Sequence, residues 1–389
     1  MNCLLIKNAD VYAPQPLGIV DLMIINDKIA KIGQQLTAPQ GLDCQILDAQ
    51  ERKVVPGYVD QHVHIIGGGG ESGPYSRTPE INLSELTKVG ITTVVGVLGT
   101  DGTSRHNESL LAKARGLTHE GITAYILTGS YEIPLHNMTG DVRRDIILIN
   151  ECLGIGEVAL SDHRSSQPTR EELEKVLTQA RLGGMLSGKA GIVQFHMGVG
   201  KRGMDVLLAI VKETEIPARH FIPTHVNRAF HLFEQAKEFA RLGGYVDITS
   251  GIREQDGFPA CVKPSDAIKI LYEEGVPLDR ITMSSDANGC MSVTLPDGRQ
   301  KQLAVSPDSF QEEVKDALLA GVPTDVVAKV VSSNPAQANG LYPQKGCLQP
   351  DSDADLIIYS DTYDIDTVIA KGQIMVAAGE ALVKGTFEK

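Results

Sequence analysis

Between residues 54 and 319, short apolar runs alternate with amphipathic segments of about 10–15 residues. Parallel strands joined by crossover helices produce this alternation. Eight such units predict an α/β fold, a (β/α)8 TIM barrel within residues 56–344. The predicted strands are 54–59, 92–97, 123–127, 157–160, 191–196, 221–225, 245–248 and 281–284. The predicted helices are 82–89, 109–120, 170–182, 204–212, 231–242, 264–273 and 309–319.

Both ends of the chain have a different sequence pattern, in which short β-rich runs are separated by polar turns. The runs are 4–12, 19–25, 28–32 and 45–47 at the amino end, and 354–359, 367–370, 373–376 and 380–383 at the carboxyl end. We expect residues 1–55 and 345–389 to pair into one small β-sandwich domain beside the barrel.

The charge balance restricts the classes of partner. The net charge is −13 and the isoelectric point is near 5.3, which disfavours nucleic acid and anionic membranes because both repel an acidic protein. No apolar stretch approaches the roughly 18–20 residues of a membrane-spanning helix, and the first residues lack the pattern of a secretion signal. These features predict a cytoplasmic enzyme.

The six cysteines are scattered and contain no Cys-x-x-Cys pair. A disulfide framework and a thiolate zinc site are therefore not expected, and reduced thiols fit better. Any metal ion must be held by imidazole and carboxylate groups.

The first candidate ligands are His62 and His64, which end an apolar strand and precede four glycines. Residues two apart in a strand point to the same side, so the two imidazoles can chelate one ion. Other potential ligands also fall at or near the ends of predicted strands, where barrel enzymes carry their chemistry. These are Glu157, His196, His225 and Asp286, with Tyr131 nearby. Four histidines and two carboxylates make a ligand set for two cations such as Zn²⁺.

Several motifs resemble the amidohydrolase superfamily and, within it, the isoaspartyl (β-aspartyl) dipeptidases. The matching segments are 57–71, 98–101, 161–165, 195–198, 223–228 and 284–289. The most specific are Gly-Gly-Gly-Gly-Glu at 67–71, Asp-His-Arg at 162–164 and Thr-His-Val-Asn-Arg at 224–228. Together the six matching segments are distributed along most of the chain.

The resemblance implies two zinc ions, joined by a bridging carboxylate and a bridging hydroxide. His62, His64 and Asp286 would hold one ion, and His196 and His225 the other. In the family pattern the bridge is a carbamylated lysine on strand 4, but this sequence has Glu157 there, after one apparent extra residue. A glutamate already carries the two oxygens that carbamylation creates, although on a shorter arm.

The remaining assignments concern the substrate. Asp286 would act as general base and then as general acid, and Tyr131 would donate to the oxyanion. Two guanidinium groups match the two carboxylates of a β-linked aspartyl dipeptide, and Glu71 matches its ammonium group. The expected substrate-binding residues are Gly69, Gly70, Glu71, Thr100, Tyr131, Arg164, Arg228 and Cys290, the last replacing a serine of the family.

These observations predict a dizinc dipeptidase that hydrolyses β-aspartyl dipeptides, with a small anionic dipeptide as its partner. By resemblance we also expect a homo-oligomer, such as an octamer. Two alternatives remain open. One is another amidohydrolase, either a cyclic amidase such as dihydropyrimidinase or dihydroorotase, or an N-acyl-amino-acid deacylase. The other is a metal-free scaffold.

Overall fold

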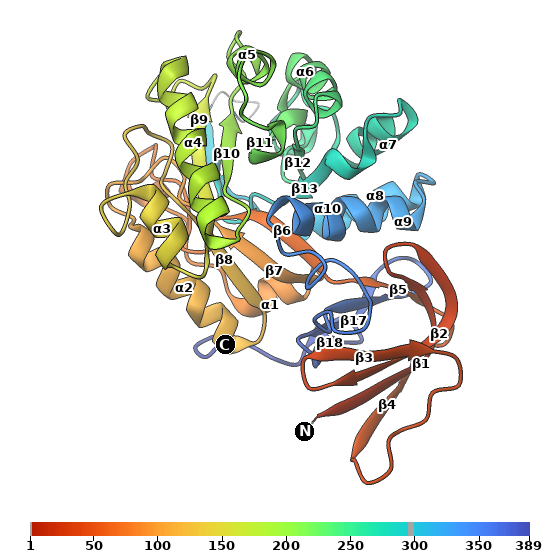
Figure 1. The fold of residues 1–389 in the computed structure, drawn as a ribbon. Coiled ribbons are helices and arrows are strands. Elements are labelled where there is room, and N and C mark those ends of the chain that lie inside the picture. Colours follow the sequence, from red (N-terminus) through yellow and green to blue (C-terminus); the bar gives the residue numbers. More distant parts are fainter. Residues whose placement is uncertain (1, 295–298) are drawn as a thin grey trace.

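The computed structural model describes residues 2–294 and 299–389, and its centre is a set of parallel strands (Figure 1). These strands are β6 (Tyr58–Val63), β7 (Ile91–Gly96), β8 (Thr123–Thr128), β9 (Cys152–Leu160), β10 (Ile192–Met197), β11 (Phe221–Thr224), β12 (Val246–Thr249) and β13 (Ile281–Ser284). Strands β6 to β11 form one sheet in chain order, and β12 pairs with β13. A parallel bridge between Val63 and Ala287 links β6 to the segment after β13. The arrangement is of the TIM-barrel type, and seven of the eight predicted strands are present as single elements.

Helices follow most of these strands and pack around them (Figure 1). They are α1 (Leu83–Thr87), α2 (Asn107–Glu120), α3 (Val142–Leu148), α4 (Arg170–Ser187), α5 (Asp205–Glu213), α6 (Phe230–Arg241), α7 (Pro264–Glu273), α8 (Asp308–Leu319), α9 (Thr324–Ala328) and α10 (Asn334–Ala338). Thr169 caps α4 together with Glu172 in a capping box, which fixes its start. Within the described residues, no helix is both long and apolar enough to span a membrane.

Strands from the two chain ends are hydrogen-bonded in one nine-stranded sheet. They are β1 (Cys3–Tyr12), β2 (Pro16–Ile25), β3 (Lys28–Gly33), β4 (Cys44–Asp48), β5 (Lys53–Pro56), β16 (Leu356–Tyr359), β17 (Ile365–Ala370), β18 (Gln373–Ala377) and β19 (Glu380–Ala381). Antiparallel pairing of β5 with β16, for example Val55 opposite Ile357, joins the two ends. The domain boundaries 1–55 and 345–389, and the division into two stacked layers, stay predictions.

The predicted strand 54–59 is wrong as a single element, because it serves two sheets. Pro56 ends β5 in the nine-stranded sheet, and Tyr58 begins β6 in the barrel. The amide of Gly57 donates to Asp355 O at 2.9 Å. A Cβ atom on Gly57 would lie 2.3 Å from Thr92 Oγ1, so the chain passes too closely for any side chain.

The structure also corrects the expectation that all six cysteines are reduced. Cys3 and Cys44 form a disulfide between β1 and β4, with their Cα atoms 4.5 Å apart. The two residues are register partners in a parallel ladder, which spacing along the sequence does not reveal. The other four cysteines are free.

Several short elements were not predicted. Asp141 caps α3 by accepting from the amides of Arg143 and Arg144. α9 and α10 are joined through a π-helix at Lys329–Ser333. A hairpin of β14 (Cys290–Thr294) and β15 (Gln300–Ala304) follows β13 and brings Cys290 to the mouth of the barrel.

Candidate metal centre and active site

The six predicted ligands lie at the carboxyl ends of barrel strands, as the barrel argument requires. His62, Glu157 and His196 lie within β6, β9 and β10, and the other three follow β6, β11 and β13 directly. Backbone hydrogen bonds hold two of these ends together, from Asp286 N to His62 O and from His64 N to Ala287 O. All six side chains are buried or nearly so, at 13 % exposure or less.

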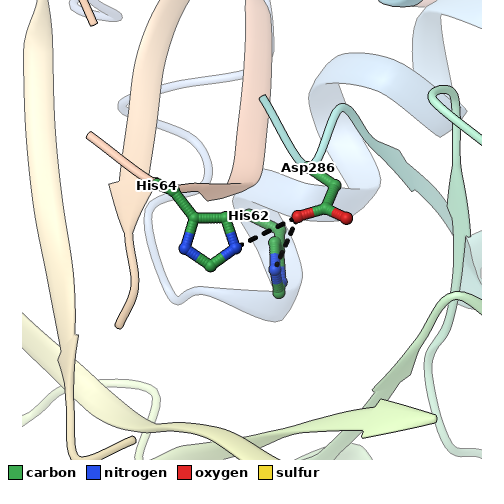
Figure 2. Close-up of side chains that lie close together, drawn as sticks. All are labelled: His62, His64 and Asp286. Carbon is green, nitrogen blue, oxygen red and sulfur yellow. Dashed lines mark ion pairs between the residues drawn. The ribbon is translucent and has the colours of Figure 1, made fainter. Parts of the chain in front are cut away.

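The first group consists of two imidazoles that converge on one carboxylate oxygen (Figure 2). Asp286 Oδ1 lies 3.1 Å from His64 Nε2 and 3.5 Å from His62 Nε2. Glu157 Oε1 approaches the same nitrogens at 3.5 Å and 3.4 Å. Two nitrogens and two oxygens therefore surround one point.

The second group uses the other oxygen of Glu157. Its Oε2 lies 3.0 Å from His196 Nδ1 and 3.6 Å from His225 Nε2. The rings of His196 and His225 meet edge to face, with centroids 4.6 Å apart. The carboxylate of Glu157 thus lies between the two histidine pairs, with one oxygen toward each.

These atoms fit metal ions better than direct hydrogen bonds. The Nε2 atoms of His62 and His225 are buried and make no hydrogen bond among the described residues. Ligand atoms at about 2.0–2.1 Å from a tetrahedral zinc ion are about 3.4 Å from one another. The observed N···O separations of 3.0–3.6 Å are close to that spacing.

Neighbouring polar groups orient two of the rings. His62 Nδ1 lies 2.9 Å from Gln194 Oε1, and His225 Nδ1 lies 2.8 Å from Thr249 Oγ1. Such partners of the second ring nitrogen fix the tautomer of a metal-binding histidine. Sequence reasoning missed both residues, although Gln194 lies two positions before His196 and therefore on the same side of β10.

The backbone at two of the ligands is strained. His225 and Asp286 have φ values of 65° and 60°, in the left-handed region that non-glycine residues rarely adopt. Such outliers cost about 1–3 kcal/mol each and cluster at functional sites. The fold therefore holds these two side chains in place at an energetic cost.

Electrostatics keeps the carboxylates ionised. Burial raises the pKa of Glu157, but His62 and His196 outweigh this and hold it well below its usual value. Burial also raises the pKa of Asp286, but the neighbouring imidazoles of His62 and His64 outweigh this and hold it well below its usual value. Burial and the charge of Arg228 lower the pKa of His225 to about 3, so this imidazole is neutral, as a metal ligand must be.

A cavity of about 620 Å³ opens onto this cluster. Its wall contains seven of the eight predicted substrate-binding residues, together with His64, His196 and Asp286. The seven are Gly69, Glu71, Thr100, Tyr131, Arg164, Arg228 and Cys290. Gly70 instead lines an adjacent hollow of about 380 Å³, so the structure does not bring it into this cavity.

The polar wall of the cavity is a connected set of charged groups. Glu71 Oε1 accepts from Thr100 Oγ1 at 2.8 Å and pairs with Arg164 Nη1 at 3.1 Å. Arg228 Nη1 donates to Met197 O at 3.2 Å, and its buried Nε has no partner among the described residues. A ligand that carries both carboxylate groups and an ammonium group would find complementary charges here.

Tyr131 lies between the metal cluster and the arginines. Its hydroxyl is 2.7 Å from His196 Nδ1, and Arg164 stacks over its ring at 5.2 Å. Burial and the charge of Glu157 raise its pKa well above the ordinary value. The hydroxyl therefore keeps its proton and can act as a donor.

The remaining wall includes features that sequence reasoning did not assign. Cys290 Sγ donates to Gln302 Oε1 at 3.2 Å, across the β14–β15 hairpin. A Cβ atom on Gly69, which has a φ of +72°, would lie 2.7 Å from Cys290 Cβ, so glycine permits this approach. Residues 257–260 and Asp162 complete the wall, and His163 lies at its edge, 89 % exposed.

The chain resembles known proteins over most of its length. The model of the amidohydrolase family matches residues 53–375. A solved β-aspartyl dipeptidase of Fervidobacterium islandicum AW-1, in complex with β-Asp-Leu dipeptide, is 41 % identical with a TM-score of 0.90, and the match covers 97 % of each chain. The dihydropyrimidinase of Brevibacillus agri shares the fold, with a TM-score of 0.69 at 17 % identity over 98 % of this chain and 97 % of its own.

Among curated relatives, the adenine deaminase of Roseobacter denitrificans is 23 % identical over 97 % of this chain. This chain spans 57 % of the length of that relative. The match to the family model covers most of the sequence, including every candidate ligand. The chain belongs to the amidohydrolase family.

Proposed function

We propose that this protein is a dinuclear metal-dependent dipeptidase that hydrolyses β-aspartyl dipeptides. The observation that carries the proposal is the cavity, in which Glu71, Arg164 and Arg228 face a cluster of four histidines and two carboxylates. The 41 % identity to a β-aspartyl dipeptidase over 97 % of both chains supports the same substrate class.

The residues that would hold two Zn²⁺ ions are His62, His64 and Asp286 for one, and His196 and His225 for the other. Glu157 would contribute one oxygen to each. Two such cations, when bound, would lower the pKa of a shared water so that hydroxide is available at neutral pH. Among the described residues that line the cavity there is no lysine, so the bridge would be Glu157 itself rather than a carbamate.

Proton transfer is assigned to Asp286. Its carboxylate lies in the cavity wall beside the cluster, and its pKa is held low, so it can take the proton of the attacking water. The same proton would then pass to the leaving amine. Tyr131 would donate its hydroxyl hydrogen bond to the oxyanion as the carbonyl carbon becomes tetrahedral.

Substrate orientation is assigned to the polar wall. The α-ammonium group of the β-aspartyl unit would pair with Glu71, and the two carboxylates of the dipeptide, one on each residue, with Arg164 and Arg228. Thr100 holds Glu71, while Gly69 lets the backbone approach closely. An α-linked peptide would place its carbonyl one carbon away from the attacking water, so the β-linkage would be favoured.

A side-by-side assay tests the proposal. Purified protein with zinc added should cleave β-Asp-Leu much faster than α-Asp-Leu, and should cleave dihydrouracil little or not at all. Preference for the cyclic amide would replace the proposal with a cyclic amidase. No cleavage together with no bound metal would point to a scaffold. Size-exclusion chromatography would test the expected homo-oligomer.

A further inference from the structure

We infer that Asp162 is a positioning residue that fixes both the guanidinium of Arg164 and the tautomer of His196. One carboxylate would thereby link substrate recognition to metal binding. The inference rests on the proposed function for its substrate half, whereas its metal half can be measured without any substrate.

Asp162 binds the guanidinium of Arg164 with both of its carboxylate oxygens. Oδ1 accepts from Arg164 Nε at 2.9 Å and from its backbone amide at 2.8 Å, and Oδ2 accepts from Nη2 at 2.9 Å. The Asp162 side chain is only 8 % exposed. This fork geometry fixes the plane of the guanidinium and leaves Nη1 directed at Glu71, 3.1 Å away.

The second contact concerns the protonation of His196. Asp162 Oδ2 also lies 3.2 Å from His196 Nε2, whereas His196 Nδ1 faces Glu157 Oε2 at 3.0 Å. A neutral imidazole carries its proton on one nitrogen alone. Binding a metal through Nδ1 therefore requires the proton on Nε2, with an acceptor beside it.

The groups around His196 Nε2 favour different positions of that proton. Arg164 Nη2 and Arg228 Nη1 each lie 3.1 Å from Nε2, and guanidinium groups can only donate. They favour an unprotonated Nε2 and hence the tautomer that cannot bind a metal through Nδ1. Asp162 Oδ2, at 3.2 Å, is the nearest described acceptor to this nitrogen and favours the opposite tautomer, while the hydroxyl of Tyr131 lies farther away, at 3.4 Å. We therefore assign the choice of tautomer to Asp162.

The test compares Asp162→Asn with Arg164→Gln, their double variant, and Glu171→Gln as a control at an exposed residue in the first turn of α4, outside the cavity wall. Zinc affinity is measured by competition with a chelator, and KM and kcat are measured with β-Asp-Leu. D162N should bind the zinc held by His196 and His225 about 10–100-fold more weakly, and its KM should rise at least about tenfold, by loss of one partner of the Arg164 pair. R164Q should raise KM without weakening zinc binding, and E171Q should resemble the parent.

The double variant separates the two roles. Because Asp162 acts on KM through Arg164, KM in the double variant should be no higher than in R164Q, while its zinc affinity should be weaker than that of R164Q. Unchanged zinc affinity in D162N, or fully additive effects on KM, would overturn the inference. Absence of β-Asp-Leu cleavage by the parent would overturn the proposed function, while the zinc measurement would still decide the tautomer half.

Folding is checked by thermal unfolding of each variant. Asp162→Ser serves as a second substitution if D162N does not unfold cooperatively. If both substitutions abolish the cooperative transition, Asp162 has a structural role and the inference is overturned.

Discussion

Glu157 on β9 places its Oε1 atom 3.4 Å from Nε2 of His62 on β6, so one buried acid reaches across the mouth of the barrel. A carboxylate in this place needs no chemical modification to offer an oxygen to each of two cations. The relationship therefore bears directly on how the centre would assemble.

Assembly without carbon dioxide is the first prediction. Metal-free protein supplied with zinc should regain full activity at the same rate with and without added bicarbonate, because the bridging oxygens belong to Glu157. Recovery that depends strongly on bicarbonate would indicate a carbamylated lysine and contradict the assignment. Activity is followed over time after zinc addition, in buffers stripped of carbon dioxide.

Glu157→Gln is expected to lose metal as well as activity. The amide removes the negative charge that two cations would share, so bound zinc should fall below two per chain and kcat by about 100-fold or more. Elemental analysis and steady-state kinetics check this. Glu132→Gln is a matched control, because Glu132 is 48 % exposed and pairs with His136 alone.

Tyr131→Phe should lower kcat with little change in bound zinc. Loss of one donor to an oxyanion typically costs about 10²–10³-fold in kcat, and the phenyl ring keeps the packing against Arg164. KM for β-Asp-Leu should stay within about threefold, since the hydroxyl would act mainly in the transition state. Tyr75→Phe, at a residue 80 % exposed, should leave both constants unchanged.

Glu71→Gln tests recognition of the ammonium group. A hydrogen bond to a charged group contributes about 1.5–3 kcal/mol, and the Glu71 side chain is 26 % exposed, so kcat/KM for β-Asp-Leu should fall by at least about tenfold. N-acetyl-β-Asp-Leu lacks the ammonium group, and the parent and the variant should cleave it at similar low rates. An equal loss on both substrates would argue against the assigned role. Glu80→Gln, at a 61 % exposed residue, is the control.

Much of the fold was predictable because its signals are local. Apolar runs and helical spacing identify the barrel strands, and position at a strand end then identifies His62, His64 and Asp286. Prediction failed where it required the register between strands that lie far apart in the sequence. The partnership of Cys3 with Cys44 depends on the parallel pairing of β1 and β4, which no spacing rule contains.

The same reason explains the residues missed at the site. A histidine's second nitrogen needs a partner, but which neighbour supplies it depends on how adjacent strands are aligned. Thr249 reaches His225 because β12 lies beside the end of β11, and nothing in the sequence near Thr249 signals this. Asp162 was part of a motif, yet its two roles depend on the fold around Arg164.

Lys345 offers a prediction about stability, remote from the cavity. Its Nζ atom lies 2.7 Å from both Asp353 Oδ2 and Asp355 Oδ2, and its side chain is 1 % exposed. Lys345→Met would leave two buried carboxylates without this partner, a change that typically costs about 3–5 kcal/mol. Its unfolding midpoint should fall by several degrees, whereas the exposed Lys175→Met should leave the midpoint unchanged.

The pH dependence of that stability follows from the shifted groups. Burial raises the pKa of Asp353, but Lys345 and Lys28 outweigh this and lower it below the usual 3.8. The stabilisation is therefore present above pH 3.8 and is lost as the pH falls through the lowered pKa. Burial lowers the pKa of Lys345, but Asp355 and Asp353 raise it above 10.5, so at alkaline pH the contribution is lost as the pH rises through that raised pKa.

Midpoints measured from acid to alkaline pH should therefore differ most between parent and K345M in the neutral plateau and converge at both extremes. A constant difference across the whole range would contradict the ionic origin.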